Sequence, residues 1–313
     1  MRADSPYVSG VSIRPHQSTV GGVRIRRSDV ARRRRWSDSG MRGLALGAAI
    51  VCVLPLAAVL AFVTINGAAA LNLDLITRPS RALGRGGGAL GAILGTLQMV
   101  PLAALMAVPA GVAGGIYVGE FADRRSARLV RFAADVMVGV PSILIGIFVF
   151  TFLVLPFKQY NAFAGSVALA VIMIPVILRT TEEMLRLVPG SLREASLALG
   201  IPMWRTVWSV IVRTGRGGIL TGVMLALARA MGETAPLLFT ALGSRLVNLG
   251  DFGKPMDSLP VFIYVNARQP YELLNQQAWG GGVPADADRA GHQRRRPRPY
   301  AGTNHWNVRA VRP

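Results

Sequence analysis

Long uncharged apolar runs dominate the middle of the chain. The five longest cover residues 44–65, 89–118, 136–155, 162–178 and 217–243, and the last is interrupted only by Arg229 and Glu233. The hydrocarbon core of a bilayer is about 30 Å thick, so a spanning helix needs about 20 apolar residues. Proline within such runs is tolerated, because neighbouring helices satisfy the freed backbone groups. The pattern predicts five transmembrane helices, and it disfavours the alternative of buried helices in a large soluble protein.

Composition and charge agree with this interpretation. The chain has 313 residues, of which 51% are hydrophobic and 16% charged, against about 25% charged in soluble domains. The formal net charge is +19, but residues 1–43 carry +7 (ten Arg, three acids) and residues 280–313 carry +5 (seven Arg, two acids). The ends are therefore basic and the centre apolar. A nucleic-acid binder is disfavoured because neither end contains a recognisable reading module, and solvated or lipid-facing charge explains the Arg-rich ends better.

The apolar core contains few residues that could act as catalytic groups or metal ligands. Cys52 is the single cysteine, and the three histidines all lie in the polar ends. The two lysines, Lys158 and Lys254, are followed by Gln159 and Pro255, whereas a phosphate-binding loop needs its lysine within G-x-x-x-x-G-K-[ST]. A membrane-bound enzyme is thus disfavoured. We expect no catalytic residue, metal or cofactor in this chain, and ATP hydrolysis would have to occur on another subunit.

Arginine placement predicts the orientation. By the positive-inside rule, the Arg-rich segment 1–43 and loops 119–131 and 179–216 are cytoplasmic. Loop 66–88, with three arginines, and loop 244–279 then lie outside. The first run could alternatively be a cleaved signal, but it is longer than a usual signal region. We expect a multi-pass protein of the plasma membrane with a cytoplasmic N-terminus.

The polar segment 179–216 contains a predicted short helix. Ser191 and Glu194 have the spacing of a capping box, in which each side chain satisfies a free backbone N–H of the helix start. Gly200 suits the left-handed position that ends a helix. The helical spacing of four residues predicts that they share one face of small and apolar side chains: Leu192, Ala195, Ser196 and Leu199. Spacing alone leaves open whether this face docks into another protein or packs on its own membrane domain.

The stretch Glu194-Ala195-Ser196-x-x-x-Gly200, followed by Val210-Ile211-Val212, resembles the E-A-A-x-x-x-G loop of ABC importer permeases. The resemblance implies a coupling helix that docks into a groove on the ATP-hydrolysing subunit, with Ser191, Glu194, Ala195, Ser196 and Gly200 as its site. Ser196 replaces the second Ala of the pattern, and Arg213 stands where the loop usually ends in Pro.

Four further stretches resemble the permeases of phosphate importers in particular: 116–121, 139–143, 228–241 and 270–279. The resemblance covers about residues 44–279. It implies an all-α polytopic membrane protein with the ABC type I importer permease fold, five transmembrane helices being evident and the expected sixth missing. It also implies three kinds of partner, namely a second homologous permease subunit, a dimer of ATP-binding subunits and a phosphate-binding protein. A permease for another oxyanion (phosphonate, sulfate or molybdate) is the alternative.

Arg229 and Glu233 are expected to pair on one helix, because they are four residues apart. An ionisable residue inside a span suggests function by default, and guanidinium suits phosphate oxygens. We therefore predict that both line the substrate pathway, with a structural ion pair as the alternative. The small residues at 226, 228, 230 and 232 would let the second permease approach closely.

The sequence thus divides into a basic N-terminal segment (1–43), a first transmembrane helix (44–65), an importer transmembrane domain (89–279) and a basic tail (280–313). In the resembling family, Gln276-Gln-Ala-Trp279 leads into a final membrane helix, yet residues 280–313 contain no apolar window long enough to form one. We predict a frameshift near codon 280, either a real mutation or a sequencing error, with a natural five-span variant that carries a solvated tail as the alternative. If the frameshift is present, the chain as written lacks a helix that the two-subunit pore should need and would be an inactive truncated copy. Translating the DNA after codon 279 in the other two frames tests it.

Overall fold

The computed structural model describes residues 27–68, 71–80, 87–244 and 246–281. The chain divides after Ala61 into two compact units. The helices, together with three π-helical turns (η2 to η4), are α1 (Arg27–Gly67), α2 (Leu73–Thr77), α3 (Leu90–Ile116), η2 (Tyr117–Phe121), α4 (Arg124–Gly139), α5 (Ser142–Val149), η3 (Phe150–Val154), α6 (Ala162–Arg186), α7 (Gly190–Ala198), α8 (Met203–Thr206), η4 (Val207–Ile211), α9 (Val212–Met231), α10 (Ala235–Thr240), α11 (Leu259–Ala267) and α12 (Glu272–Gly281).

Helix α1 provides the described part of the first unit. Its stretch Gly40–Gly67 is long and apolar enough to cross a membrane, and none of its apolar window is buried inside the protein. Large side chains such as Leu44, Val51 and Leu60 are exposed. Exposure of this much apolar surface to water is unfavourable, whereas exposure to lipid is not. The structure therefore supports the predicted first transmembrane helix.

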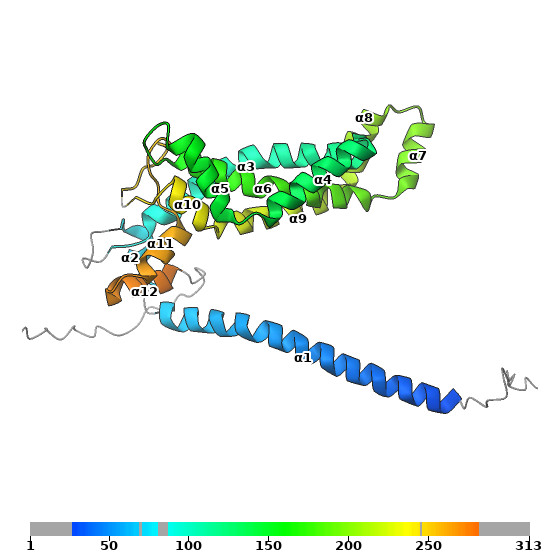
Figure 1. The fold of residues 1–313 in the computed structure, drawn as a ribbon, viewed down its shortest axis with the longest axis horizontal. Coiled ribbons are helices and arrows are strands. Elements are labelled where there is room, and N and C mark those ends of the chain that lie inside the picture. The colour runs from blue at the N-terminus through cyan, green and yellow to red at the C-terminus, as the bar shows by residue number, and fades with distance from the viewer. Residues whose placement is uncertain (1–26, 69–70, 81–86, 245, 282–313) are drawn as a thin grey trace, which may run out of the picture. The chain divides into compact units, whose positions relative to one another are not determined.

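Helix α6 is the centre of the second unit, where α3, α4, α5, α9 and α10 all contact it (Figure 1). The main core joins α3, α6 and α9 through apolar residues that are almost completely buried, including Met99, Leu169, Met173, Ile177 and Ala226. Because apolar side chains converge on α6 from several neighbours, it forms the rigid axis of this unit.

Small residues allow α3 to lie directly against α6. A Cβ atom added to Gly111 would lie 2.7 Å from the Cβ atom of Ile177, and one added to Gly115 would lie 2.6 Å from that of Thr181. Both distances are shorter than real carbon contacts, so only glycine fits at these two positions. Close backbone approach through small residues is typical of helix packing in membranes.

Within the described residues, four helices are long and apolar enough to span a membrane, and a bent pair adds a fifth if it is counted as one span. The bent pair corrects one prediction: run 136–155 is not a single helix. Helices α4 and α5 meet at an angle of 99° around Val140 and Pro141. Proline cannot donate a backbone hydrogen bond and disfavours helical backbone in the residue before it, so the break falls there.

The last predicted run, 217–243, is also divided. Its spanning helix begins earlier, at Met203, and ends at Met231. Gly232 caps α9, and α10 begins separately at Ala235 with a proline at its start. The described residues form helices and two isolated bridges, so the all-α prediction is confirmed for them. The predicted tail starts at residue 280, where Gly280 and Gly281 still belong to α12, and the rest of it, residues 282–313, lies outside the described part of the chain.

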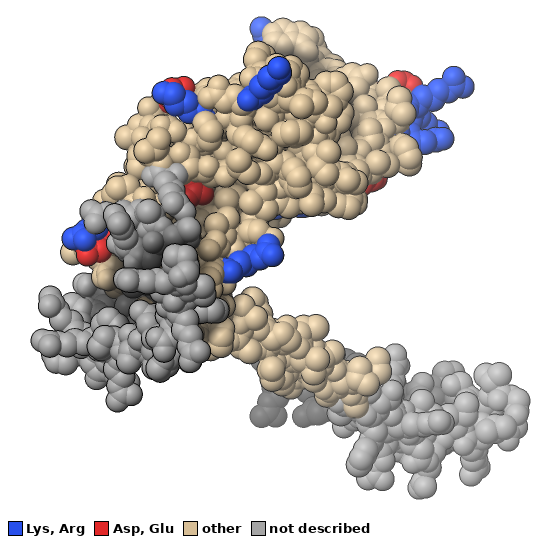
Figure 2. Space-filling view, turned by 60° about the vertical axis from the view of Figure 1, so that its left-hand side comes forward, with Lys and Arg blue, Asp and Glu red and all other residues tan. Residues whose placement is uncertain are grey.

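The face of the described residues seen in Figure 2 is mostly uncharged. Figure 2 shows Lys, Arg, Asp and Glu side chains sparsely scattered, with broad areas between them that carry none. Large apolar side chains on α5 and α9, among them Phe148, Leu220 and Leu225, are exposed. Exposed apolar surface of this extent marks contact with lipid or with another protein.

Candidate functional site

The two predicted site regions lie at opposite ends of the second unit. Figure 1 shows α7 and α8 at one end of the helical bundle and α10 and α11 at the other. Ser191, Glu194, Ala195, Ser196 and Gly200 belong to the first end, around α7. Arg229 and Glu233 belong to the second end, where α9 gives way to α10. The predicted site residues therefore lie in two separate regions of this unit.

The predicted capping box at the start of α7 does not form. Pro189 is the residue that precedes the helix, and no side chain caps the free N–H groups there. Ser191 is already the second helical residue, and Glu194 is exposed on the next turn. The extended backbone of Pro189, whose ring fixes φ, starts the helix earlier than the Ser-x-x-Glu pattern implies.

The predicted end of α7 is confirmed. Gly200 has a φ of +73°, which is the left-handed conformation that glycine adopts without strain. Its N–H donates to the carbonyl of Leu197 at 2.9 Å, and the N–H of Ile201 donates to that of Ser196 at 3.3 Å. These two bonds form a Schellman motif, which satisfies the last carbonyls of the helix and reverses the chain toward α8.

The faces of α7 differ from the predicted face. Ser196 is buried, and its hydroxyl lies 2.8 Å from that of Thr206 at the end of α8. Glu194, Ala195 and Leu199 are exposed. One side of α7 thus packs on its own domain, as the second alternative has it, while docking of the exposed side into another protein stays a prediction.

Two residues that the sequence did not single out hold the inner side of α7. Arg193 pairs with the carboxylate of Glu120 at 2.5 Å, and the Glu120 side chain is only 3% exposed. The same guanidinium donates to the carbonyls of Val188 at 2.9 Å and Leu185 at 3.0 Å. The hydrogen bond to Glu120 raises the pKa of Arg193, so this guanidinium stays charged.

A second buried acid, Glu182 on α6, is also new. Its side chain is 1% exposed and lies 2.5 Å from Arg131, 2.7 Å from Arg186 and 3.4 Å from Arg179. Arg179 additionally forms two 2.8 Å hydrogen bonds with Asp135 of α4. The cluster ties α4 to α6. The only sequence signal was an acid surrounded by arginines, which does not reveal a partner 51 residues away.

The predicted charged pair exists with a different geometry. Arg229 lies in the last turn of α9, and Glu233 lies beyond the helix end, after Gly232. The Arg229 Nε and Glu233 Oε1 atoms are 3.4 Å apart, and the side chains are 45% and 15% exposed. A single long hydrogen bond leaves most of the guanidinium donors of Arg229 available to another anion.

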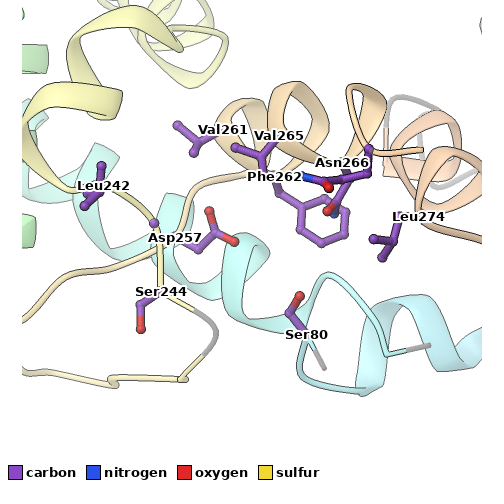
Figure 3. A pocket seen from close by; sticks show the side chains of 11 residues that line it. Ser80, Leu242, Ser244, Asp257, Val261, Phe262, Val265, Asn266 and Leu274 are labelled. Atoms are coloured by element: carbon purple, nitrogen blue, oxygen red, sulfur yellow. The ribbon is translucent and has the colours of Figure 1, made fainter. Parts of the chain in front are cut away.

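A cavity of about 170 Å³ lies near the same end, lined by Ser80, Asp257, Phe262 and Asn266 among others. Figure 3 shows the Asp257 carboxyl group extending toward the side of the cavity formed by α11. The backbone N–H of Ser258 donates to it at 2.9 Å. Burial raises the pKa of Asp257 to about 6, because a carboxylate loses solvation there.

Comparison with known proteins gives consistent matches. The family model described as "Binding-protein-dependent transport system inner membrane component" matches residues 111–264. The phosphate transport system permease protein PstA of Pasteurella multocida is 42% identical over 219 residues, which are 70% of this chain and 78% of that protein. The PstA protein of Haemophilus influenzae is 39% identical over 251 residues, covering 80% and 89%.

A relative from Mycobacterium tuberculosis (strain H37Rv), phosphate transport system permease protein PstA 1, is 42% identical over 199 residues, which cover 63% of this chain and 64% of that protein. Among solved structures, an inward-facing MetNI methionine ABC transporter is similar at 20% identity with a TM-score of 0.48, covering 58% of this chain and 82% of that chain.

Proposed function

Because this chain belongs to the PstA-type permeases of the binding-protein-dependent transport family, we propose that it passes inorganic phosphate across the plasma membrane, driven by ATP hydrolysis on a separate subunit. Phosphate is the cargo named for each of the three PstA relatives. The family is one of transport permeases, not of enzymes in themselves, and its members are multi-pass membrane proteins with several apolar helices.

The observation that carries the proposal is the exposed side of α7 at one end of an apolar bundle. Glu194 and Ala195 are exposed there. The opposite side of the helix packs on its own domain, and the helix ends at Gly200. A short helix of this kind is marginal alone, but the fixed inner side gives it a defined position. It therefore offers a ready surface to an ATP-binding subunit. Ser196 shapes this surface through Thr206 instead of contacting the partner.

Arg229 supports phosphate as the cargo. Its guanidinium is partly exposed and is held by Glu233 through one long bond. The forked N–H donors of a guanidinium suit the oxygens of phosphate. Because Glu233 holds Arg229 only weakly, phosphate could replace the Glu233 carboxylate on Arg229, and the carboxylate could later displace the phosphate. The exposed apolar side chains of α9, including Met224 and Leu225, would pack against a second homologous permease subunit.

The remaining parts of the system follow from this function. We infer that a dimer of ATP-binding subunits docks on α7, that a phosphate-binding protein delivers the anion at the α10 end, and that membrane lipid surrounds α1. The chain then needs no cofactor of its own. Its N-terminus would be cytoplasmic, because α7 must face the compartment that contains ATP, in agreement with the arginine distribution.

The test is the double variant Glu194→Lys with Gly200→Pro in the assembled importer. It reverses the exposed charge of α7 and removes the left-handed turn, while no spanning helix is touched. We expect the variant to reach the membrane, to lose the ATP-binding subunit on purification and to lose ATP-driven phosphate uptake. Gly190→Ala is the matched control, because a Cβ atom there meets no other atom and its φ is not left-handed. Normal binding of the ATP-binding subunit by the double variant would contradict the proposal.

A further inference from the structure

We propose that Arg193 is a positioning residue that locks the proposed coupling helix α7 to the end of transmembrane helix α3 through Glu120, so that movement of one is passed to the other. The proposal deepens the proposed function and rests on it for its transport consequence. Arg193 does not belong to the exposed side of α7. Its guanidinium instead connects three segments of the chain that are separate in sequence.

The contacts of Arg193 are numerous and specific. Its Nε and Nη2 atoms donate to the two carboxylate oxygens of Glu120 at 3.1 Å and 2.5 Å. Its Nη1 and Nη2 atoms donate to the carbonyls of Val188 and Leu185, which lie at and beyond the end of α6. A planar guanidinium is the one side chain that can make a two-bond fork and still bind two carbonyls.

Glu120 is held rigidly on the other side. It belongs to the π-helical turn η2, which continues α3, and such turns are often found at functional sites. Among the described residues, Arg193 is the cation with which its carboxylate forms an ion pair. Gly119, next to it, would place a Cβ atom in contact with Leu185 of α6. The carboxylate thus has a fixed position between α3 and α6.

Removing either member of this pair leaves an uncompensated charge in a nearly closed site. The other contacts of α7 with its domain include the Ser196 to Thr206 bond, which connects it only to α8. Without Arg193, α7 would keep its helical end at Gly200 but would lose the side-chain hydrogen bonds that join it to Glu120 at the end of α3 and to the carbonyls of Leu185 and Val188. Binding of ATP to a docked subunit would then move α7 without moving the transport helices.

The lock can be tested without any transport. Cys52 is the single cysteine, so Cys52→Ser with Ala198→Cys places one spin label on the exposed side of α7. In the full chain in lipid nanodiscs, we expect Arg193→Gln and Glu120→Gln each to add a mobile component to the electron paramagnetic resonance spectrum. The double variant should be no more mobile than Arg193→Gln, because residues that act through one another are not additive.

Arg213→Gln is the control, since Arg213 is exposed on α9 and should leave the spectrum unchanged. If Arg193→Gln does not reach the membrane, Arg193→Lys carries the same test, because it keeps the charge but not the fork. A wild-type spectrum for both the Arg193 and Glu120 variants, or mobilities that simply add, would overturn the lock.

The second experiment measures phosphate uptake and ATP hydrolysis by the assembled importer. We expect Arg193→Gln to retain the ATP-binding subunit and its ATP hydrolysis but to lose most of the phosphate carried per ATP. Unchanged phosphate per ATP would overturn the transmission role. If the wild-type importer carries no phosphate, the proposed function fails, and the spin-label measurement still decides the lock.

Discussion

Two arginine–glutamate pairs in the second unit differ in almost every physical respect. Arg193 and Glu120 are 73 residues apart in sequence, make two hydrogen bonds to each other, and bury the carboxylate almost completely. Arg229 and Glu233 are four residues apart, make one bond of 3.4 Å, and leave the guanidinium 45% exposed. The first pair connects segments of the fold, whereas the second closes a short turn after α9.

The difference assigns the two pairs different tasks. A buried pair is costly to break, because each charge has lost its solvation and depends on the other. An exposed pair contributes about 1 kcal/mol or less to stability, so either member can exchange its partner at little cost. We therefore expect the buried pairs to hold the helices in register and the exposed pair to be available to the transported anion.

The largest effect is expected from Glu182, whose carboxylate serves three arginines. Glu182→Gln would leave Arg131, Arg179 and Arg186 with less compensation, and we expect the free energy of unfolding to fall by about 3–5 kcal/mol. Glu233→Gln is the comparison at the more open pair, whose side chains are 45% (Arg229) and 15% (Glu233) exposed, with an expected loss below about 1 kcal/mol. Denaturant titration of the purified chain in detergent compares the two. Equal losses would remove the distinction between buried and exposed pairs.

Asp257 extends the comparison, because it is a half-buried acid for which desolvation is the main influence on the pKa, whereas the glutamates above form ion pairs. Its folded-state pKa, about 6, lies above the ordinary pKa of 3.8 for an aspartate side chain. Between these values the folded state keeps a proton that the unfolded state has lost, so stability falls as pH rises from about 4 to about 6. The full difference corresponds to about 3 kcal/mol.

Asp257→Asn should remove this pH dependence, because the amide oxygen still accepts the hydrogen bond from Ser258 but carries no charge. The quantity to compare is the change in unfolding free energy between pH 4 and pH 7.5, since other titrating groups cancel between variant and wild type. We expect the wild type to lose more stability than the variant over this range. Parallel pH profiles would show that Asp257 is solvated or paired.

Features set by local chain chemistry could be predicted from the sequence. The apolar runs predicted the spans because burial in lipid requires them, and Gly200 marked the end of α7 because only the left-handed turn requires glycine there. The predicted helix at 217–243 was wrong at its end, because apolar character continues past Gly232 although the helix does not. Hydrophobicity indicates the membrane, whereas glycine and proline decide where helices break within it.

Features set by distant contacts could not be predicted in this way. Glu120 and Arg193 were visible in the sequence, but nothing local joins residues 73 positions apart. The capping box at Ser191 failed because Pro189 is the residue that precedes α7, so Ser191 is already helical and cannot cap the helix.

The central claim is that phosphate passes Arg229 while ATP hydrolysis acts through α7. The most direct measurement is phosphate uptake and ATP hydrolysis recorded together in proteoliposomes that contain the assembled importer, for wild type and Arg229→Gln. We expect ATP-dependent phosphate uptake by the wild type, and for Arg229→Gln a loss of most uptake with assembly and ATP hydrolysis retained. Undiminished phosphate uptake by Arg229→Gln, or wild-type uptake of another oxyanion in place of phosphate, would contradict the account.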